Sequence, residues 1–159
     1  KGENVMGTQQ ILMIVLSVII VGVAVGVGIT MFQNQAVNSN RQAVIADLNN
    51  FGAQAIAWYK LPKNMGGGGN GDPGFGITTE DTPPTAGLLS YIGFVDPETG
   101  EGVNLYKNDN GTYELTANAS TLTITGTGKE KIGDAEVQAT LTINMTLTPG
   151  DQIDLVIDR

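Results

Sequence analysis

The side chains able to do chemistry in this 159-residue chain are acids, amides and hydroxyls, because the sequence contains no His and no Cys. Their absence removes thiol chemistry, disulfides, most zinc or copper sites and the commonest general base. The acids are scattered without a spacing typical of paired catalytic carboxylates. The glycines at residues 66–69 lack the preceding strand and following Lys-Ser/Thr of a phosphate loop. We therefore expect no enzyme activity and no cofactor.

Two oxygen-rich stretches, KNDNGTY and DPETGE, contain the ligand type that calcium prefers. Neither has the spacing of an EF-hand loop, so the competing interpretation is a hairpin turn and a surface loop. The weak candidate ligands are Asp96, Glu98, Glu101, Asn108 and Asp109.

Three Asn-X-Ser/Thr triplets match the acceptor pattern for N-glycosylation. Such triplets also arise by chance in a Thr-rich sheet, and intact mass separates the two interpretations. The candidate acceptors are Asn110, Asn118 and Asn144.

Charge is distributed unevenly along the chain. Residues 1–60 carry a net charge of +1, whereas residues 61–159 carry −9. An acidic distal part argues against a module that binds nucleic-acid phosphates. We expect no nucleic-acid partner.

An uncharged apolar run of 22 residues, 11–32, lies near the start of the sequence. Spanning a bilayer takes about 20 residues, whereas the apolar core of a secretory signal is about 7–15 residues long. The chain opens at Lys1 and retains the run, which favours processing in front of it. Residues 1–32 are therefore predicted to be a hydrophobic N-terminal helix that anchors the chain in a membrane.

The helix is predicted to continue through residues 33–60 as an amphipathic segment. Apolar residues recur there at three- and four-residue steps, interrupted by Arg41, which is typical of a helix packing on a partner. Pro62, the first proline, is expected to end the helix. The members of this stripe are Val37, Val44, Leu48, Phe51, Ala55 and Trp58, widened by Ile45, Ile56 and Tyr59.

Residues 61–76 are rich in Gly and Pro and are predicted to form a loop. A flexible linker is one interpretation. Trp58 and Phe75, as apolar anchors on either side, favour a surface loop that joins the helix to the rest of the chain.

Residues 77–159 are predicted to form an acidic β-rich head. Asn110-Gly111 is the favoured dipeptide for a tight hairpin, and later segments alternate apolar and Thr-rich positions. Four or five antiparallel strands packed against residues 33–60 would form an α+β fold, in which the helix supplies the missing core face.

This arrangement resembles the type IV pilin superfamily, which includes bacterial pilins, type II secretion pseudopilins and archaeal relatives. The sequence LMIV at residues 12–15 is similar to the apolar start of those subunits, and the resemblance covers roughly residues 1–60. Bacterial pilins usually begin with an aromatic residue and carry an early glutamate. Here Glu3 is the only acid before Asp47, and the proline that often breaks the family helix is missing.

The resemblance implies a structural subunit that is cut by a prepilin peptidase, at Lys1 or beside Gly2 or Gly7. It waits in the cytoplasmic (inner) membrane and is extracted by an assembly platform and its ATPase. It then polymerises with itself into an extracellular type IV pilus-like helical filament. Glu3 would neutralise a neighbour's terminal amine; the alternative is a charge at the lipid headgroups. The implied assembly residues are Glu3, Gln9, Gln10, Ile11, Leu12, Ile14, Val15, Ile19, Gly22, Gly26 and Gly28.

Three glycines in the apolar run have two interpretations. Gly22, Gly26 and Gly28 could let the helix unwind locally in an assembled filament, as the family does near its proline. Alternatively, the Gly22 and Gly26 spacing is that of a close helix–helix contact.

Two other functions stay open. A type II secretion-like pseudopilin would form a short periplasmic piston. A single-pass anchored binding domain would not polymerise, and detergent extracts would contain monomers. Adhesion, motility and DNA uptake are not distinguished by the sequence.

Overall fold

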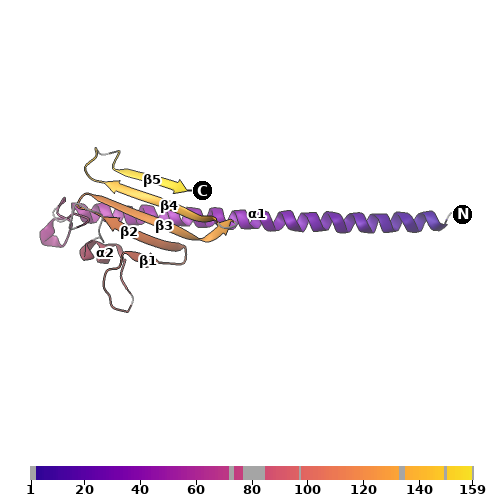
Figure 1. The fold of residues 1–159 in the computed structure, drawn as a ribbon, viewed down its shortest axis with the longest axis horizontal. Coiled ribbons are helices and arrows are strands. Elements are labelled where there is room, and N and C mark those ends of the chain that lie inside the picture. Colours follow the sequence, from indigo (N-terminus) through magenta and orange to yellow (C-terminus); the bar gives the residue numbers. More distant parts are fainter. Residues whose placement is uncertain are drawn as a thin grey trace. The chain divides into compact units, whose positions relative to one another are not determined.

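The structure is a computed structural model that describes residues 3–71, 74–76, 85–96, 98–132, 135–148 and 150–158. Two compact units divide the chain, Lys1–Ala36 and Val37–Arg159. Helix α1 (Glu3–Lys60) contributes to both units (Figure 1). The other elements are η1 (Lys63–Met65), α2 (Ala86–Ile92), β1 (Leu105–Lys107), β2 (Gly111–Ala117), β3 (Thr121–Ile132), β4 (Ala135–Asn144) and β5 (Ile153–Asp158).

The second unit is built on a five-stranded sheet in the order β1-β2-β3-β4-β5. Every neighbouring pair is antiparallel. With α1, this sheet gives the predicted α+β fold. A hairpin is present, because β1 and β2 pair Tyr106 with Tyr113, but the predicted tight turn at Asn110-Gly111 is wrong. Gly111 begins β2, and neither Asn110 nor Gly111 has the positive φ that a two-residue turn needs.

The second half of α1 lies against one face of this sheet (Figure 1). The six residues that define the predicted stripe are buried, from fully covered Val44 and Leu48 to Phe51 at 9% exposure. Of the residues that widen it, Tyr59 is buried, whereas Ile45 and Ile56 are half-buried. Phe51 packs edge-on against Phe94 and Tyr113, with ring centroids 4.9 and 5.2 Å apart. Alternate residues of β2 are buried in turn, because successive strand side chains point to opposite faces. Helix and sheet therefore share one hydrophobic core.

The Gly-rich loop folds back onto the C-terminal end of α1. The backbone N–H groups of Gly68 and Asn70 donate to the carbonyl oxygens of Trp58 and Tyr59, at 2.9 and 3.0 Å. These bonds satisfy carbonyls that a helix end leaves without partners. Phe75 is fully buried and its ring lies 4.7 Å from that of Tyr59. These contacts hold described residues of the loop on the helix end; the prediction covered residues 61–76, of which 72 and 73 lie outside the described part.

One helix was not predicted. Residues 77–159 were expected to be a β-rich head without a helix, but α2 forms a short helix that buries Leu88, Leu89 and Ile92. Gly93 ends it in the left-handed conformation, and its N–H donates to the carbonyls of Leu89 and Ser90. The prediction failed because seven residues are too few to show a helical period clearly.

Candidate assembly surface

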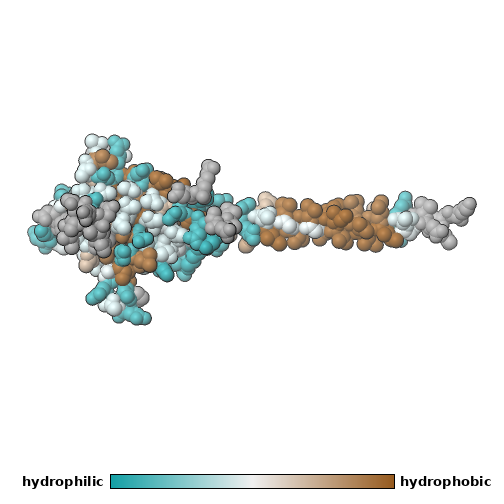
Figure 2. All heavy atoms as spheres, viewed as in Figure 1, coloured by the Kyte–Doolittle hydropathy of each residue, from teal (hydrophilic) through white to brown (hydrophobic). Residues whose placement is uncertain are grey.

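The apolar run forms a helical surface that is exposed on all sides in the single chain. Every side chain described from residue 7 to residue 35 is exposed, with Leu12 at 71% and Phe32 at 75%. Figure 2 shows the hydrophobic side chains as a continuous brown stretch along this part of α1. Among the described residues, α1 is the one helix long and apolar enough to cross a membrane. We call residues 11–32 the apolar segment.

The hydroxyls within the apolar segment are satisfied by their own helix. Ser17 Oγ donates to the carbonyl of Ile14 at 2.8 Å, and Thr30 Oγ1 donates to that of Val27 at 2.8 Å. Neither side chain therefore presents an unpaired donor to a neighbour. Just ahead of the segment, Gln9 and Gln10 are exposed.

The three glycines lie inside unbroken helix. α1 is continuous through Gly22, Gly26 and Gly28, and no heavy atom beyond the local helix lies within 4 Å of the place where a Cβ would stand. The single chain thus has no local unwinding here, and the glycines leave three open notches on the helix. Such notches allow a second helix backbone to approach closely.

The start of the segment has a shallow hollow among its side chains. Leu12, Val15, Leu16 and Ile19 line a depression of about 250 Å³. These positions have the spacing of a hole that accepts one side chain from a facing helix. Three of the expected assembly residues, Leu12, Val15 and Ile19, thus form with Leu16 a surface suited to helix packing. The side chain of Glu3 and the structure of Lys1 and Gly2 lie outside the described residues.

A polar cluster joins α1 to the β1–β2 turn in the second unit. Asp47 Oδ2 accepts hydrogen bonds from Asn108 Nδ2 at 2.9 Å, Asn110 Nδ2 at 2.8 Å and the Tyr113 hydroxyl at 2.6 Å. About two helical turns before Asp47, Asn40 Nδ2 donates to the carbonyl of Asn110 at 2.7 Å. We call these residues the Asp47 clamp. The clamp holds the hairpin turn against the helix.

The clamp keeps Asp47 ionised and Tyr113 protonated. Partial burial would raise the pKa of the Asp47 carboxyl, but the hydrogen bonds from Asn110, Tyr113 and Asn108 outweigh it, and the pKa lies below its ordinary value. Burial and the neighbouring Asp47 carboxylate raise the pKa of Tyr113. At neutral pH the hydrogen bonds to the ionised Asp47 carboxylate are therefore charge-assisted, and their role is structural.

Sequence reasoning missed the clamp. Asp47 lies three residues after Val44 and four before Phe51, so it faces the same side of the helix as the buried stripe. A lone acid at such a position needs polar partners, and the Asn-rich turn could have been recognised as their source.

Three of the five candidate calcium ligands already have other partners. Asn108 Oδ1 accepts from the backbone N–H groups of Asn110 and Gly111, and Asp96 Oδ1 accepts from that of Glu98. Asp109 is fully exposed and lies 3.8 Å from Lys129. Within the described ranges no three acidic side chains converge on one point.

The three candidate glycosylation sites differ in how their side-chain amides are used. Asn110 Nδ2 is bonded to Asp47 within the clamp. Asn118 and Asn144 use Oδ1 to accept bonds from residues just after them, at 2.8–3.0 Å for Asn118 and 2.7–3.0 Å for Asn144. A glycan on Asn110 would be attached to the nitrogen that donates to Asp47, whereas these bonds of Asn118 and Asn144 use Oδ1.

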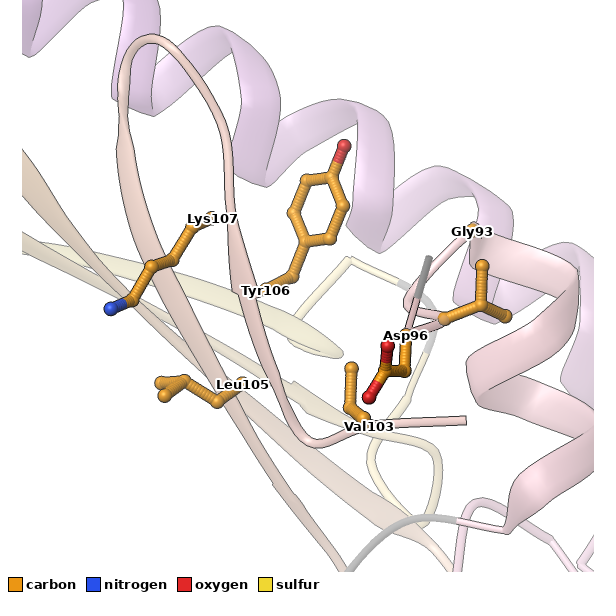
Figure 3. A pocket seen from close by; sticks show the side chains of 7 residues that line it. Gly93, Asp96, Val103, Leu105, Tyr106 and Lys107 are labelled. Carbon is orange, nitrogen blue, oxygen red and sulfur yellow. The ribbon is translucent and has the colours of Figure 1, made fainter. Parts of the chain in front are cut away.

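The second unit also has an open depression of about 560 Å³ between the end of α2 and β1. Figure 3 shows the Lys107 side chain pointing away from Asp96, while the Tyr106 ring lies toward α1. Tyr106 packs 4.8 Å from the Phe94 ring, so it serves the core. This depression does not bring together groups suited to acid–base catalysis.

Comparisons with protein-family models, with curated proteins and with solved structures give no match to this chain.

Proposed function

We propose that this chain is a structural subunit of a type IV pilus-like filament. The single observation that carries the proposal is the apolar segment, whose side chains lie exposed on every side of an uncharged helix. Burying apolar surface is worth about 25 cal/mol per Å² relative to water, so such a surface needs either lipid or protein around it.

In this proposal the segment first lies in the cytoplasmic membrane, with the head outside. Extraction by the assembly machinery then exchanges lipid for the same segment of neighbouring copies. Gly22 and Gly26 provide notches for close backbone approach, and Leu12, Val15, Leu16 and Ile19 provide a hollow for a facing side chain. The subunit acts by packing and performs no catalysis.

The head is suited to a structural role. Its core is shared between α1 and the sheet. The Asp47 clamp bonds the helix to β2 at Tyr113, and the Gly-rich loop bonds both the helix end and the β2–β3 turn. Residues 37–60 of α1 and the sheet therefore fold as one packed unit.

A pseudopilin and a single-pass anchored binding domain are the competing functions. Electron microscopy of detergent-free material sheared from cells separates all three. Long filaments in which this chain is the dominant protein support the proposal. Discrete soluble monomers with the apolar segment intact, or a chain that leaves the membrane only in detergent, would contradict it.

A further inference from the structure

The two edges of the sheet are protected very differently against pairing with another strand. β1 has three residues and includes Lys107, whereas β5 has six residues and includes Asp154 and Asp158, so strand length is the main difference between the edges. In the part of the chain that the structure describes, no strand pairs with the outer side of β5 (Figure 1). An unpaired edge offers a row of backbone N–H and C=O groups to a further strand.

One side of β5 is apolar and yet only partly covered. Ile153, Leu155 and Ile157 lie opposite the buried residues Ile143, Leu141 and Ala139 of β4. Ile153 remains 53% exposed and Ile157 41% exposed. Ile153 also borders a depression of about 320 Å³ whose other walls come from α1 and β4. The core face of the sheet therefore continues to this edge and stops there uncovered.

We propose that β5 pairs antiparallel with β5 of a second copy of this chain, in register about Leu155. In this register Leu155 lies opposite the second copy's Leu155, and Ile153 lies opposite the second copy's Ile157. Residues directly opposite each other in a sheet share a face. The pairing therefore joins the two partly covered apolar sides into one surface.

The charges select this register among its neighbours. About Leu155, Asp154 lies opposite the uncharged Val156 of the second copy. A register centred on Asp154 would place two copies of that aspartate opposite each other, and one centred on Val156 would place Asp154 opposite residue 158, also Asp in the sequence. Like charges directly opposite destabilise a strand pair, and a shift by a single residue would mix the two faces.

The pairing has a fixed symmetry. Two copies paired in this way are related by a two-fold axis normal to the sheet. That axis reverses the strands, and it also reverses residues 37–60 of α1, which lie along them (Figure 1). Subunits that all point the same way within one filament cannot form such a pair. The second copy therefore belongs to a filament running in the opposite direction; this last step, unlike the strand pairing, rests on the proposed function.

Single cysteines test the register, because the chain has none of its own. Opposite Cα atoms in an antiparallel pair are about 4.5–5.5 Å apart, within the range a disulfide needs. Leu155→Cys in the full chain, solubilised in detergent and oxidised, should give a disulfide-linked dimer as the main product. Ile153→Cys and Ile157→Cys are matched controls, since each lies roughly 13 Å from its own copy in this register, and should remain monomeric.

A second linking variant avoids changing Leu155, which packs against the core. Asp154→Cys combined with Val156→Cys lies on the other face of β5 and should also form dimers, whereas each of these changes alone should not. Folding of every variant is checked by near-ultraviolet circular dichroism. Failure of both linking variants, or equal linking by Leu155→Cys and its controls, overturns the strand pairing.

The same variants in sheared filaments test the inter-filament step. Links between filaments by Leu155→Cys alone support it, whereas links in detergent but none between filaments overturn that step and leave the strand pairing intact. A chain that forms no filaments overturns the proposed function, while the detergent experiment still decides the pairing.

Discussion

The two units of the chain place the same kind of side chain in opposite surroundings. Leu48 of the Val37–Arg159 unit is fully buried, whereas Leu16 of the Lys1–Ala36 unit is 57% exposed. Both residues belong to α1. The second unit has a hydrophobic core of its own, whereas the described side chains of the first unit are exposed along the whole apolar segment and need lipid or protein around them.

This difference separates folding from assembly. Changes in the second unit should alter the stability of the single chain, because its contacts lie within that chain. Changes in the apolar segment should leave that stability unaltered and act on insertion or polymerisation. Each of the following variants tests one side of this separation.

The largest effect is expected from a charge in the apolar segment. Ile19→Asp places a carboxylate near its middle, at a cost of about 3 kcal/mol in a membrane environment. Filament yield in the sheared fraction should fall about tenfold or more, while thermal unfolding of the second unit stays unchanged. Ile19→Leu is the matched control and should assemble normally. Filaments of normal yield from Ile19→Asp would contradict the separation.

A cavity in the second unit should have the next largest effect. Leu48→Ala removes a fully buried side chain and should lower the free energy of unfolding by about 2–5 kcal/mol. Chemical denaturation in detergent, followed by Trp58 fluorescence, measures this change. Leu16→Ala makes the same substitution on the exposed surface and should alter unfolding by less than about 0.5 kcal/mol. Equal changes in the free energy of unfolding for the two variants would contradict the difference between the two units.

The Asp47 clamp should contribute a pH-dependent part of the stability. Asp47→Asn removes the charge from three hydrogen bonds and should lower the free energy of unfolding by about 1–3 kcal/mol at pH 7. Because the folded pKa of Asp47 is lowered, its contribution is present above the unfolded pKa of about 3.9 and is lost as pH falls through the folded pKa.

The measurement for the clamp is the difference in unfolding free energy between wild type and Asp47→Asn from pH 7 down to acid. It should shrink as the pH falls below about 4. Asp109→Asn, at a fully exposed position in the same turn, should leave the profile nearly unaltered. A difference that is constant with pH would show that the charge does not matter.

Two glycine changes in the second unit should have opposite signs. A Cβ on Gly67 would collide with Leu61, so Gly67→Ala should lower stability by about 1–3 kcal/mol. Gly87 lies in α2, where a Cβ would meet Trp58 at an ordinary 3.5 Å, and Gly87→Ala should raise stability by up to about 1 kcal/mol. Thermal melting of both variants checks the signs. A stabilised Gly67→Ala would show that the loop is not fixed on the helix end.

Local patterns were enough to predict most of the fold. The stripe from Val37 to Trp58 and the pairing of β1 with β2 were predicted because helical and strand periods depend on neighbouring residues. The tight turn at Asn110-Gly111 was wrong, because Gly111 belongs to β2. The assembly residues were inferred from the resemblance, and their role stays a prediction. The sequence did not decide whether the three glycines allow local unwinding or close helix packing, and in the single chain the helix is continuous there.

The features that sequence reasoning missed depend on partners far along the chain. Asp47 meets Asn108, Asn110 and Tyr113 across more than 60 residues of sequence. No local period records such a contact. The partly covered side of β5 was also missed, because its alternation is identical to that of a fully covered strand.

Accessibility of the apolar segment tests the central claim most directly. Val18→Cys is introduced into the chain, which has no other cysteine, and is labelled with a polar maleimide. Labelling is measured in two samples: subunits solubilised in detergent and then diluted to exchange the detergent, and sheared filaments. Asp109→Cys is the exposed control. We expect Val18→Cys to be protected in filaments while Asp109→Cys reacts fully in both samples. Equal labelling of the two variants in intact filaments would contradict the account.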